Sequence, residues 1–425
     1  MNVIESLVLR RRLLIIFIVS CSVAMSCSRK EVVPEESIVQ KFYAVHRDSM
    51  YWLSSDERAA RASEWLTEIR LAEREGFAIT SDSINRLLTA LSDRLELDPA
   101  LKAKTDQNIT ALILDFIKFL QQGNIVFDFD EIAVHRDSVY LTQFINLPID
   151  KPVSTIISDL DCKDPDFLVL RNYLNDSISI ADTLRYKTIV LGMNYRKYLT
   201  VNRQPEYILV NIPLAEVEYY KQNELVLKMR SVMGRKLKPT PTIASYITSI
   251  VTFPFWNVPR EIGVKEILPK VQKDEAYLEQ HNFDVVDAKG NVLNDSQLHW
   301  KSYNAKNFPY YFRQSTGINN SLGVLKFNMN NPFSIFLHAT SYQGSFANDF
   351  RFLSHGCVRL EKPFALADAL MRGNLNLEEL KKGKANTRPT TLTLPDSLPV
   401  FIIYMPIRIV GSQVALLDDV YGLVK

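Results

Sequence analysis

The chain has 425 residues, enough for two domains, and its 47% hydrophobic content supports ordinary globular cores. Its formal net charge is only +2, which excludes nucleic acid as a partner held by bulk charge. The 14 glycines form no phosphate-binding loop, and the four cysteines form no CxxC pair of the kind that binds zinc.

The first 27 residues carry the pattern of an export signal. The basic cluster Arg10–Arg12 precedes a short apolar run, Leu13–Val19, which is too short to span a membrane. Ala24–Cys27 then resembles the lipobox of bacterial lipoproteins, in which the cysteine is acylated after cleavage. Cys21 is a competing site, and an uncleaved anchor helix ending near Met25 is the alternative. In either case we expect the body to be exported, membrane-anchored and facing the periplasm.

Residues 31–200 are predicted to form a helical scaffold domain. Apolar residues recur there at steps of three and four, and Ser, Thr or Gly residues stand at the expected helix ends. The predicted helices are Ser54–Gly76, a segment after Thr80, Ile109–Leu120 before Gly123, a segment from Asp164-Pro165 and one around Ile189–Tyr198.

A short motif occurs twice within this half. Ala44–Ser49 recurs as Ala133–Ser138, and a tyrosine follows two residues later in both copies. We favour two similar chain segments that flank the helices over a shared metal site. The metal alternative would use His46, Asp48, His135 and Asp137.

After Pro205 the hydrophobic period changes from helical to strand-like. Short apolar runs are separated there by Pro, Asn and Gly, which predicts a mainly β domain over residues 205–425. The predicted fold class is therefore α+β, a helical scaffold followed by a mainly β domain. The runs are Tyr207–Val210, Leu225–Met229, Phe333–Leu337 and Val400–Tyr404.

The most informative motif is Ser354–Arg359, with the sequence Ser-His-Gly-Cys-Val-Arg. A cysteine reacts as its thiolate, and an ordinary thiol pKa of about 8.5 leaves little thiolate at neutral pH. Cys357 therefore needs a base, and His338 at a strand end can point a ring nitrogen across the site. His355 is the alternative base, but it lies so close to the sulfur that we assign it, with Ser354, to the turn.

Gly356 and Arg359 complete the candidate site. Gly356 permits a sharp turn, and its N–H could converge with that of Cys357 on a developing oxyanion. Arg359 is a fixed cation that could hold a substrate carboxylate or support the thiolate. From the residues alone, a buried core cysteine and a disulfide between Cys357 and Cys162 remain alternatives.

The motif resembles the signature of L,D-transpeptidases with a YkuD-type catalytic domain, which pair an upstream histidine with Ser/Thr-His-Gly-Cys. Further segments occur in the order found in the large, scaffold-bearing, YcbB-like subgroup, so that the resemblance covers about residues 165–425. These segments are Val210–Pro213, Met233–Gly234, Thr240–Thr242, Phe255–Pro259, Arg313–Gln314 with Gly317, Leu322–Gly323, Lys326–Phe327, Tyr404 and Asp418–Tyr421.

The sequence departs from this family at two places. Ala339 stands where many large members have Asp, so the ring of His338 must be oriented by another group, such as a backbone carbonyl. The space from Asp176 to Lys187 is too short for the peptidoglycan-binding module of many large members. Ile267–Tyr311 resembles the substrate-capping lid of the subgroup, and a plain surface loop is the alternative.

The resemblance implies a two-step acyl transfer that needs no metal or organic cofactor. Cys357 would attack the third residue of a donor tetrapeptide stem, release the terminal D-alanine and pass the acyl group to an acceptor amine, giving a 3→3 cross-link. Water as acceptor would make an L,D-carboxypeptidase, and a lipoprotein amine would tether the wall. A non-catalytic wall-binding lipoprotein is the third alternative. The implied partners are peptidoglycan stem peptides and, through acylated Cys27, a membrane.

Overall fold

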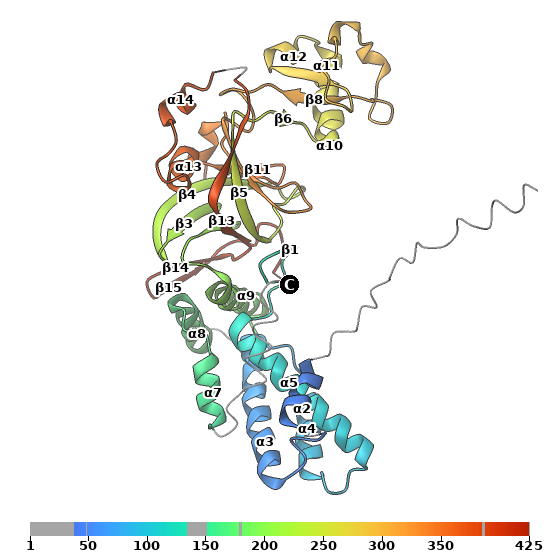
Figure 1. Ribbon diagram of the computed structural model, residues 1–425, viewed down its shortest axis with the longest axis vertical. Coiled ribbons are helices and arrows are strands. Elements are labelled where there is room, and N and C mark those ends of the chain that lie inside the picture. The colour runs from blue at the N-terminus through green and yellow to red at the C-terminus, as the bar shows by residue number, and fades with distance from the viewer. Residues whose placement is uncertain (1–37, 48, 134–150, 178–180, 385–386, 425) are drawn as a thin grey trace, which may run out of the picture.

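The computed structural model describes residues 38–47, 49–133, 151–177, 181–384 and 387–424. The molecule is elongated, with helices at one end, a large sheet in the middle and a small lid at the other end (Figure 1). The predicted α+β class is confirmed, since a helical region precedes a mostly β domain. No helix among these residues is long and apolar enough to cross a membrane. The export signal, Cys27 and the second copy of the repeated motif, apart from Ala133, lie outside the described residues.

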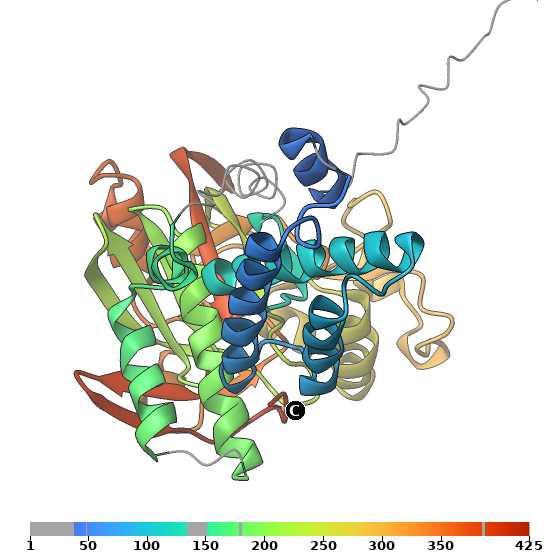
Figure 2. The same cartoon turned by 90° about the horizontal axis from the view of Figure 1, so that it is seen from below.

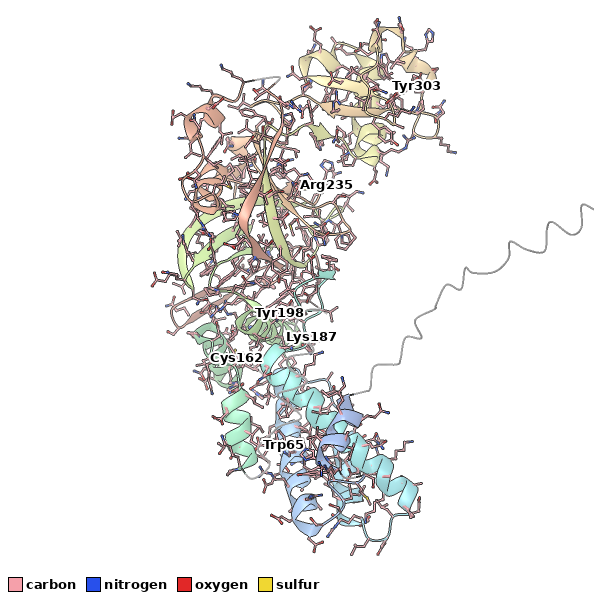
Figure 3. The ribbon with its side chains drawn as sticks, viewed as in Figure 1. Trp65, Cys162, Lys187, Tyr198, Arg235 and Tyr303 are labelled. Carbon is pink, nitrogen blue, oxygen red and sulfur yellow. The ribbon has the colours of Figure 1, made fainter. Side chains whose placement is uncertain are left out.

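Five helices of the N-terminal part share one apolar core, which contains Trp65 (Figure 3). Figure 2 views the molecule from this helical end. The predicted caps are present, because Ser55 Oγ accepts a hydrogen bond from the Arg58 N–H at 3.2 Å and Thr80 caps the next helix in the same way. The helices are α2 (Ile38–His46), α3 (Asp56–Leu71), α4 (Ser81–Ser92), α5 (Pro99–Gln122) and α7 (Val153–Leu160), with a 3₁₀ turn η1 (Ala72–Glu75).

The last two helices of the predicted scaffold domain pack against the sheet rather than in the core of the other five. Helices α8 (Pro165–Ser177) and α9 (Thr183–Asn202) lay their apolar sides against the sheet. Phe167 and Ile189 share a core with Phe401 of the sheet, and Tyr198 lies in the same layer (Figure 3). These two helices therefore pack directly on the β domain, and the boundary near residue 200 stays a prediction.

The central sheet has ten strands in the order β1-β5-β13-β2-β3-β4-β12-β10-β9, and β11 pairs with β4. The additional pairing of β9 with β5 closes the sheet on itself around an apolar core. The strands are β1 (Phe129–Asp130), β2 (Tyr207–Asn211), β3 (Glu216–Lys221), β4 (Glu224–Gly234), β5 (Ile243–Thr252), β9 (Leu325–Met329), β10 (Leu337–His338), β11 (Phe352–Ser354), β12 (Val358–Leu360) and β13 (Thr390–Ile403).

Smaller elements complete this domain. Helix α13 (Pro363–Leu370) buries Leu366 and Leu370 in the core of the closed sheet. The remaining elements are the 3₁₀ turn η6 (Gln343–Ala347), helix α14 (Leu377–Lys382) and the hairpin β14 (Ile407–Val410) and β15 (Gln413–Leu416).

The strand predicted over Phe333–Leu337 is wrong for most of its length, because only β10 is extended there. The side chain of Asn331 closes a turn instead. Its Oδ1 accepts from the N–H groups of Phe333 at 3.1 Å and Ile335 at 2.9 Å. Ser334 takes a positive φ of 57° within that turn.

The lid is a separate unit with its own apolar core, which includes Trp300, Phe308 and Phe312. A plain surface loop is therefore excluded. The lid sheet also extends beyond Ile267–Tyr311, because β6 precedes Ile267, β8 ends at Gln314, and Trp256 pairs with Gln314. Its elements are β6 (Trp256–Asn257), β7 (Phe283–Val286), β8 (Tyr311–Gln314), α10 (Arg260–Ile262), the π-helical turn η3 (Gly263–Ile267), α11 (Leu268–Lys273), α12 (Tyr277–Gln280), η4 (Asp295–Gln297) and η5 (Trp300–Ser302).

Candidate active site

The predicted base, His338, ends β10, and the predicted nucleophile, Cys357, directly precedes β12, the parallel neighbour of β10. In the register of β10 and β12, His338 pairs with Arg359. Paired residues on neighbouring strands place their side chains on the same face of the sheet, so Arg359 and His338 share a face. Residues two apart along an extended chain also share a face, so Cys357 lies on the same side as His338. Both residues line a cleft of about 780 Å³.

One wall of this cleft belongs to the lid. Trp256, Pro259, Ile262 and Glu266 line it from the lid, and Arg235 lines it at the junction with the sheet (Figure 3). Ser354, His355, Cys357 and Arg359 of the candidate motif also line it. The candidate site is therefore covered by the lid rather than fully open to solvent.

Ser354 closes the turn that presents Cys357. Its hydroxyl donates to the Cys357 carbonyl at 2.6 Å and accepts from the Gly356 N–H at 3.1 Å. Gly356 has φ 118°, in the region that favours glycine. The predicted turn is present, but the prediction that the Gly356 N–H faces an oxyanion is not met, because Ser354 occupies that N–H. Among the described residues, the Cys357 N–H has no acceptor and stays available.

Segments that are distant in sequence brace the turn from behind. The Thr240 hydroxyl donates to the Gly356 carbonyl at 2.8 Å and accepts from the Gly234 N–H at 2.9 Å. The Tyr421 hydroxyl donates to the Gly234 carbonyl at 2.5 Å. Three segments that carried the family resemblance therefore meet at the outer side of the nucleophile turn.

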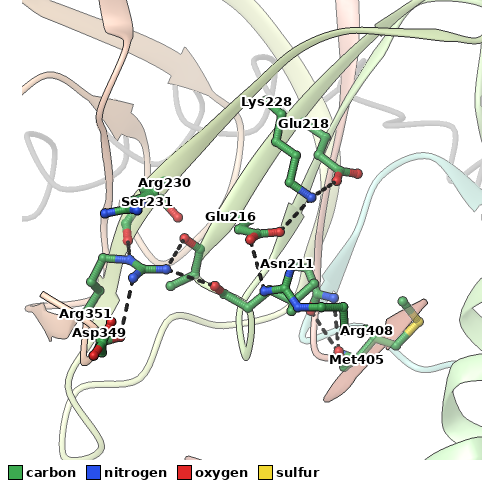
Figure 4. A network of polar contacts seen from close by, with 12 residues as sticks. Asn211, Glu216, Glu218, Lys228, Arg230, Ser231, Asp349, Arg351, Met405 and Arg408 are labelled. Carbon is green, nitrogen blue, oxygen red and sulfur yellow. Dashed lines mark hydrogen bonds and ion pairs between the residues drawn. The ribbon is translucent and has the colours of Figure 1, made fainter. Parts of the chain in front are cut away.

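Arg351 anchors the strand that leads into the motif (Figure 4). Its guanidinium donates to the carbonyls of Ser231 and Leu214, each at 3.2 Å. Its carbonyl accepts from the Met233 N–H at 2.8 Å. These bonds hold the start of β11 against β4, and Glu216 of β3 pairs with Lys228 of β4 nearby.

The Cys357 thiol is protonated at neutral pH. Burial raises its pKa to about 11, while the Phe336 N–H and the cations Lys326 and Arg359 act in the opposite direction. The sulfur donates a weak hydrogen bond to the Ser334 carbonyl at 3.8 Å. Cys162 and Cys357 are both free thiols, which excludes the disulfide alternative.

His338 is buried and neutral. Burial, together with the Arg359 cation, lowers its pKa to about 3, and the carbonyls of Ala339 and Leu322 act in the opposite direction. Nδ1 lies 2.5 Å from the Ala339 carbonyl, which can only accept, so Nδ1 carries the hydrogen. A backbone carbonyl thus orients the ring, as predicted from the absence of Asp at position 339.

The thiol and the imidazole therefore form a neutral pair. Among the described residues, no hydrogen bond joins the sulfur to His338. Catalytic hydrogen bonds often tighten only when substrate is bound. The arrangement suits proton transfer during attack, rather than a preformed thiolate.

Sequence reasoning missed Lys326 as a neighbour of this pair. In the register of β9 and β10, Lys326 lies directly across from His338, and its Nζ is 4.2 Å from the centre of the Phe336 ring. Lys326, His338 and Arg359 therefore form a row across three strands. The spacing in the sequence carries no signal for this row, because it depends on strand register.

His355 connects the motif to the lid. Its Nε2 lies 2.7 Å from Glu266 Oε1, and Arg235 pairs with the same carboxylate at 3.2 Å. Lys238 pairs with Glu261 of the lid. We call these five residues the lid latch. The role predicted for His355 was to shape the turn, and the structure adds this contact.

Two family models match the chain. The "Scaffold domain" model matches residues 37–174, and the "L,D-transpeptidase catalytic domain" (YkuD) model matches residues 205–387. A curated protein from Haemophilus influenzae named "Putative L,D-transpeptidase" is 34% identical over 234 residues. That match covers 55% of this chain and 47% of the relative, so the chain spans about half the relative's length.

Solved structures give weaker matches. A catalytic domain from the E. faecium L,D-transpeptidase acylated by ertapenem is 13% identical, covers 47% of this chain and 98% of that chain, and has a TM-score of 0.24. An L,D-transpeptidase from Mycobacterium smegmatis is 12% identical, covers 47% and 58% of the two chains, and has a TM-score of 0.21. Scores this low support no conclusion about this chain.

We predict that the alkylation rate of Cys357 by iodoacetamide keeps rising above pH 9, because burial holds the thiol pKa near 11. His338→Ala should slow alkylation at neutral pH and move the rate profile to higher pH, since the base is lost. His355→Ala, the matched control, should leave the profile unchanged. A shift with His355→Ala alone would reverse the assignment of the base.

We also predict that Glu266→Gln loosens the lid. Ion pairs this exposed contribute up to about 1 kcal/mol, so a bulky maleimide should reach Cys357 about two- to five-fold faster. A small alkylating reagent should react at nearly the same rate in both proteins. Glu279→Gln, at an exposed lid position outside the latch, serves as control. Equal maleimide rates in all three proteins would show that the latch does not hold the lid.

Proposed function

We propose, from the matches to an L,D-transpeptidase catalytic domain model and a Scaffold domain model, that the chain forms 3→3 cross-links between peptidoglycan stem peptides. The observation that carries the proposal is the parallel pairing of β10 and β12, with His338 and Cys357 in one cleft. A cysteine beside a histidine on a separate strand is suited to acyl transfer through a thioester.

In the first step, the Cys357 sulfur attacks the carbonyl carbon of the third stem residue, while His338 Nε2 takes the thiol proton. The Cys357 N–H stabilises the negative oxygen of the tetrahedral intermediate. The intermediate collapses, the bond to D-alanine breaks, and the leaving amine takes the proton from His338. The product is a thioester on Cys357 and free D-alanine.

In the second step, an amine of an acceptor stem attacks the thioester. His338 takes the amine proton and passes it to the departing sulfur, which restores the thiol. The new amide bond is the cross-link. Because His338 is neutral, its Nε2 keeps the lone pair that accepts a proton in both steps.

The lid and the export signal complete the proposal. We expect the lid, which forms one wall of the cleft, to limit the access of water to the thioester and so to favour an amine over hydrolysis. Membrane anchoring through Cys27 would hold the enzyme in the periplasm near its substrate. Metabolic labelling with a palmitate analogue, with Cys27→Ala and Cys21→Ala compared, tests this anchor.

The central experiment is incubation of purified sacculi with the protein, followed by mass spectrometry of the released muropeptides. Cross-linked dimers with a 3→3 bond and free D-alanine are expected. Tripeptide stems without dimers would instead identify an L,D-carboxypeptidase. No change in any muropeptide would overturn the proposal in favour of a non-catalytic wall-binding protein.

We predict that Cys357→Ala lowers cross-linking by at least about 1,000-fold, because a covalent nucleophile is lost. Cys162→Ala is the matched control, since Cys162 is also a free thiol but is buried in the layer between helices and sheet. That variant should keep its activity. Circular dichroism shows whether both variants fold. Substantial activity in a folded Cys357→Ala protein would contradict the thioester route.

We further predict that a carbapenem acylates Cys357. Its strained lactam carbonyl needs only a thiol, a base and an oxyanion donor, which the cleft supplies. Intact-protein mass spectrometry should show one added drug mass, and peptide mapping should place it within Ser354–Arg359. An adduct on Cys162, or none after long exposure, would count against the assigned nucleophile.

A further inference from the structure

Two cations face the reactive sulfur, and the described residues offer neither of them a carboxylate partner. Arg359 makes no hydrogen bond or ion pair there, and its Nε is buried without an acceptor. Lys326 contacts the ring of Phe336. Burying a cation without a counter-ion costs free energy, so an anion is expected to complete this site during the reaction.

The two cations differ in their access to the cleft. Arg359 lines the cleft together with His338 and Cys357, whereas Lys326 does not. Lys326 lies on β9, on the far side of His338 from β12. A ligand in the cleft can therefore reach the guanidinium of Arg359, while the ammonium of Lys326 acts on the sulfur through space.

We propose that Arg359 binds a carboxylate of the donor peptide, and that Lys326 supports the charge on the Cys357 sulfur without contacting the substrate. This inference rests on the proposed function and deepens it by identifying what selects the donor. An arginine is suited to this task, because its planar guanidinium binds a carboxylate with two hydrogen bonds.

The carboxylate of the leaving residue fits this position best. Side chains two apart on an extended strand are separated by about 6.6 Å. When the scissile carbonyl carbon is bonded to the Cys357 sulfur, the terminal carboxylate of the leaving residue lies about one residue further along the peptide. That is roughly 3.5 Å from the scissile carbon. A charge-assisted hydrogen bond of about 2.8 Å then reaches Arg359. Such an anchor would select stems that end one residue after the scissile bond.

A side-chain carboxylate on the third residue is the other source of the same chemistry. It would extend from the acyl part of the donor rather than from the leaving group. The two sources can be separated with synthetic donors, because each carboxylate can be converted to a carboxamide on its own.

The test compares three donors: the free acid, its C-terminal amide and its side-chain amide. For the wild-type protein, D-alanine or D-alaninamide release should have a kcat/KM about 10- to 100-fold lower for the C-terminal amide than for the free acid. In Arg359→Gln this ratio should fall to near one, chiefly through KM for the free acid. Arg359→Lys, which keeps the positive charge, should retain part of the preference for the free acid over the C-terminal amide.

Lys326→Gln is the matched control. This variant should slow release from all three donors equally, so the ratio of kcat/KM between the free acid and the C-terminal amide stays at the wild-type value. It should also move the pH profile of Cys357 alkylation by iodoacetamide to higher pH. If Arg359→Gln removes discrimination against the side-chain amide instead, the carboxylate site stands and its source is the third residue. If Arg359→Gln and Arg359→Lys both keep the wild-type ratios, the inference is wrong. A wild-type protein that releases nothing from any donor would refute the proposed function itself.

Discussion

The turn closed by the Ser354 hydroxyl is the constraint on which the candidate site depends. The hydroxyl binds the backbone on both sides of the reversal, so Gly356 must adopt a positive φ and the sulfur points into the cleft. Thr240 and Tyr421 fix the outer side of the same turn. The position of Cys357 is therefore set by the closed sheet as a whole, since these supports come from distant segments.

Burial and charge act against each other at this turn. Burial keeps both the thiol and the imidazole of His338 neutral, while the row of Lys326 and Arg359 makes the surroundings positive. A positive, poorly hydrated site stabilises negative charge as it develops on sulfur or oxygen. In the proposed reaction, Cys357 would stay protonated until a substrate brings the reacting carbonyl and, by our inference, a carboxylate for Arg359.

The lid and the scaffold contact this domain in different ways. The lid forms a wall of the cleft and reaches the catalytic motif through the pair of Glu266 and His355. The scaffold side is joined by packing, because α8 and α9 cover the sheet and β1 pairs with β5. Changes in lid position can thus reach the nucleophile turn directly, whereas the scaffold end has a broad, apolar attachment suited to rigid support.

The sequence alone determined the fold class, most helices and the Ser354–Arg359 motif with its glycine turn. These features depend on hydrophobic period, helix caps and backbone conformation, which are set by residues close together in the sequence. Only the tertiary structure showed which surface each apolar face covers. In it, α8 and α9 pack on the sheet, and the strands of the lid extend beyond Ile267–Tyr311. It also showed that Ser354 occupies the Gly356 N–H and that Lys326 lies across from His338. Such pairings follow from strand register and long-range packing, which linear spacing does not encode.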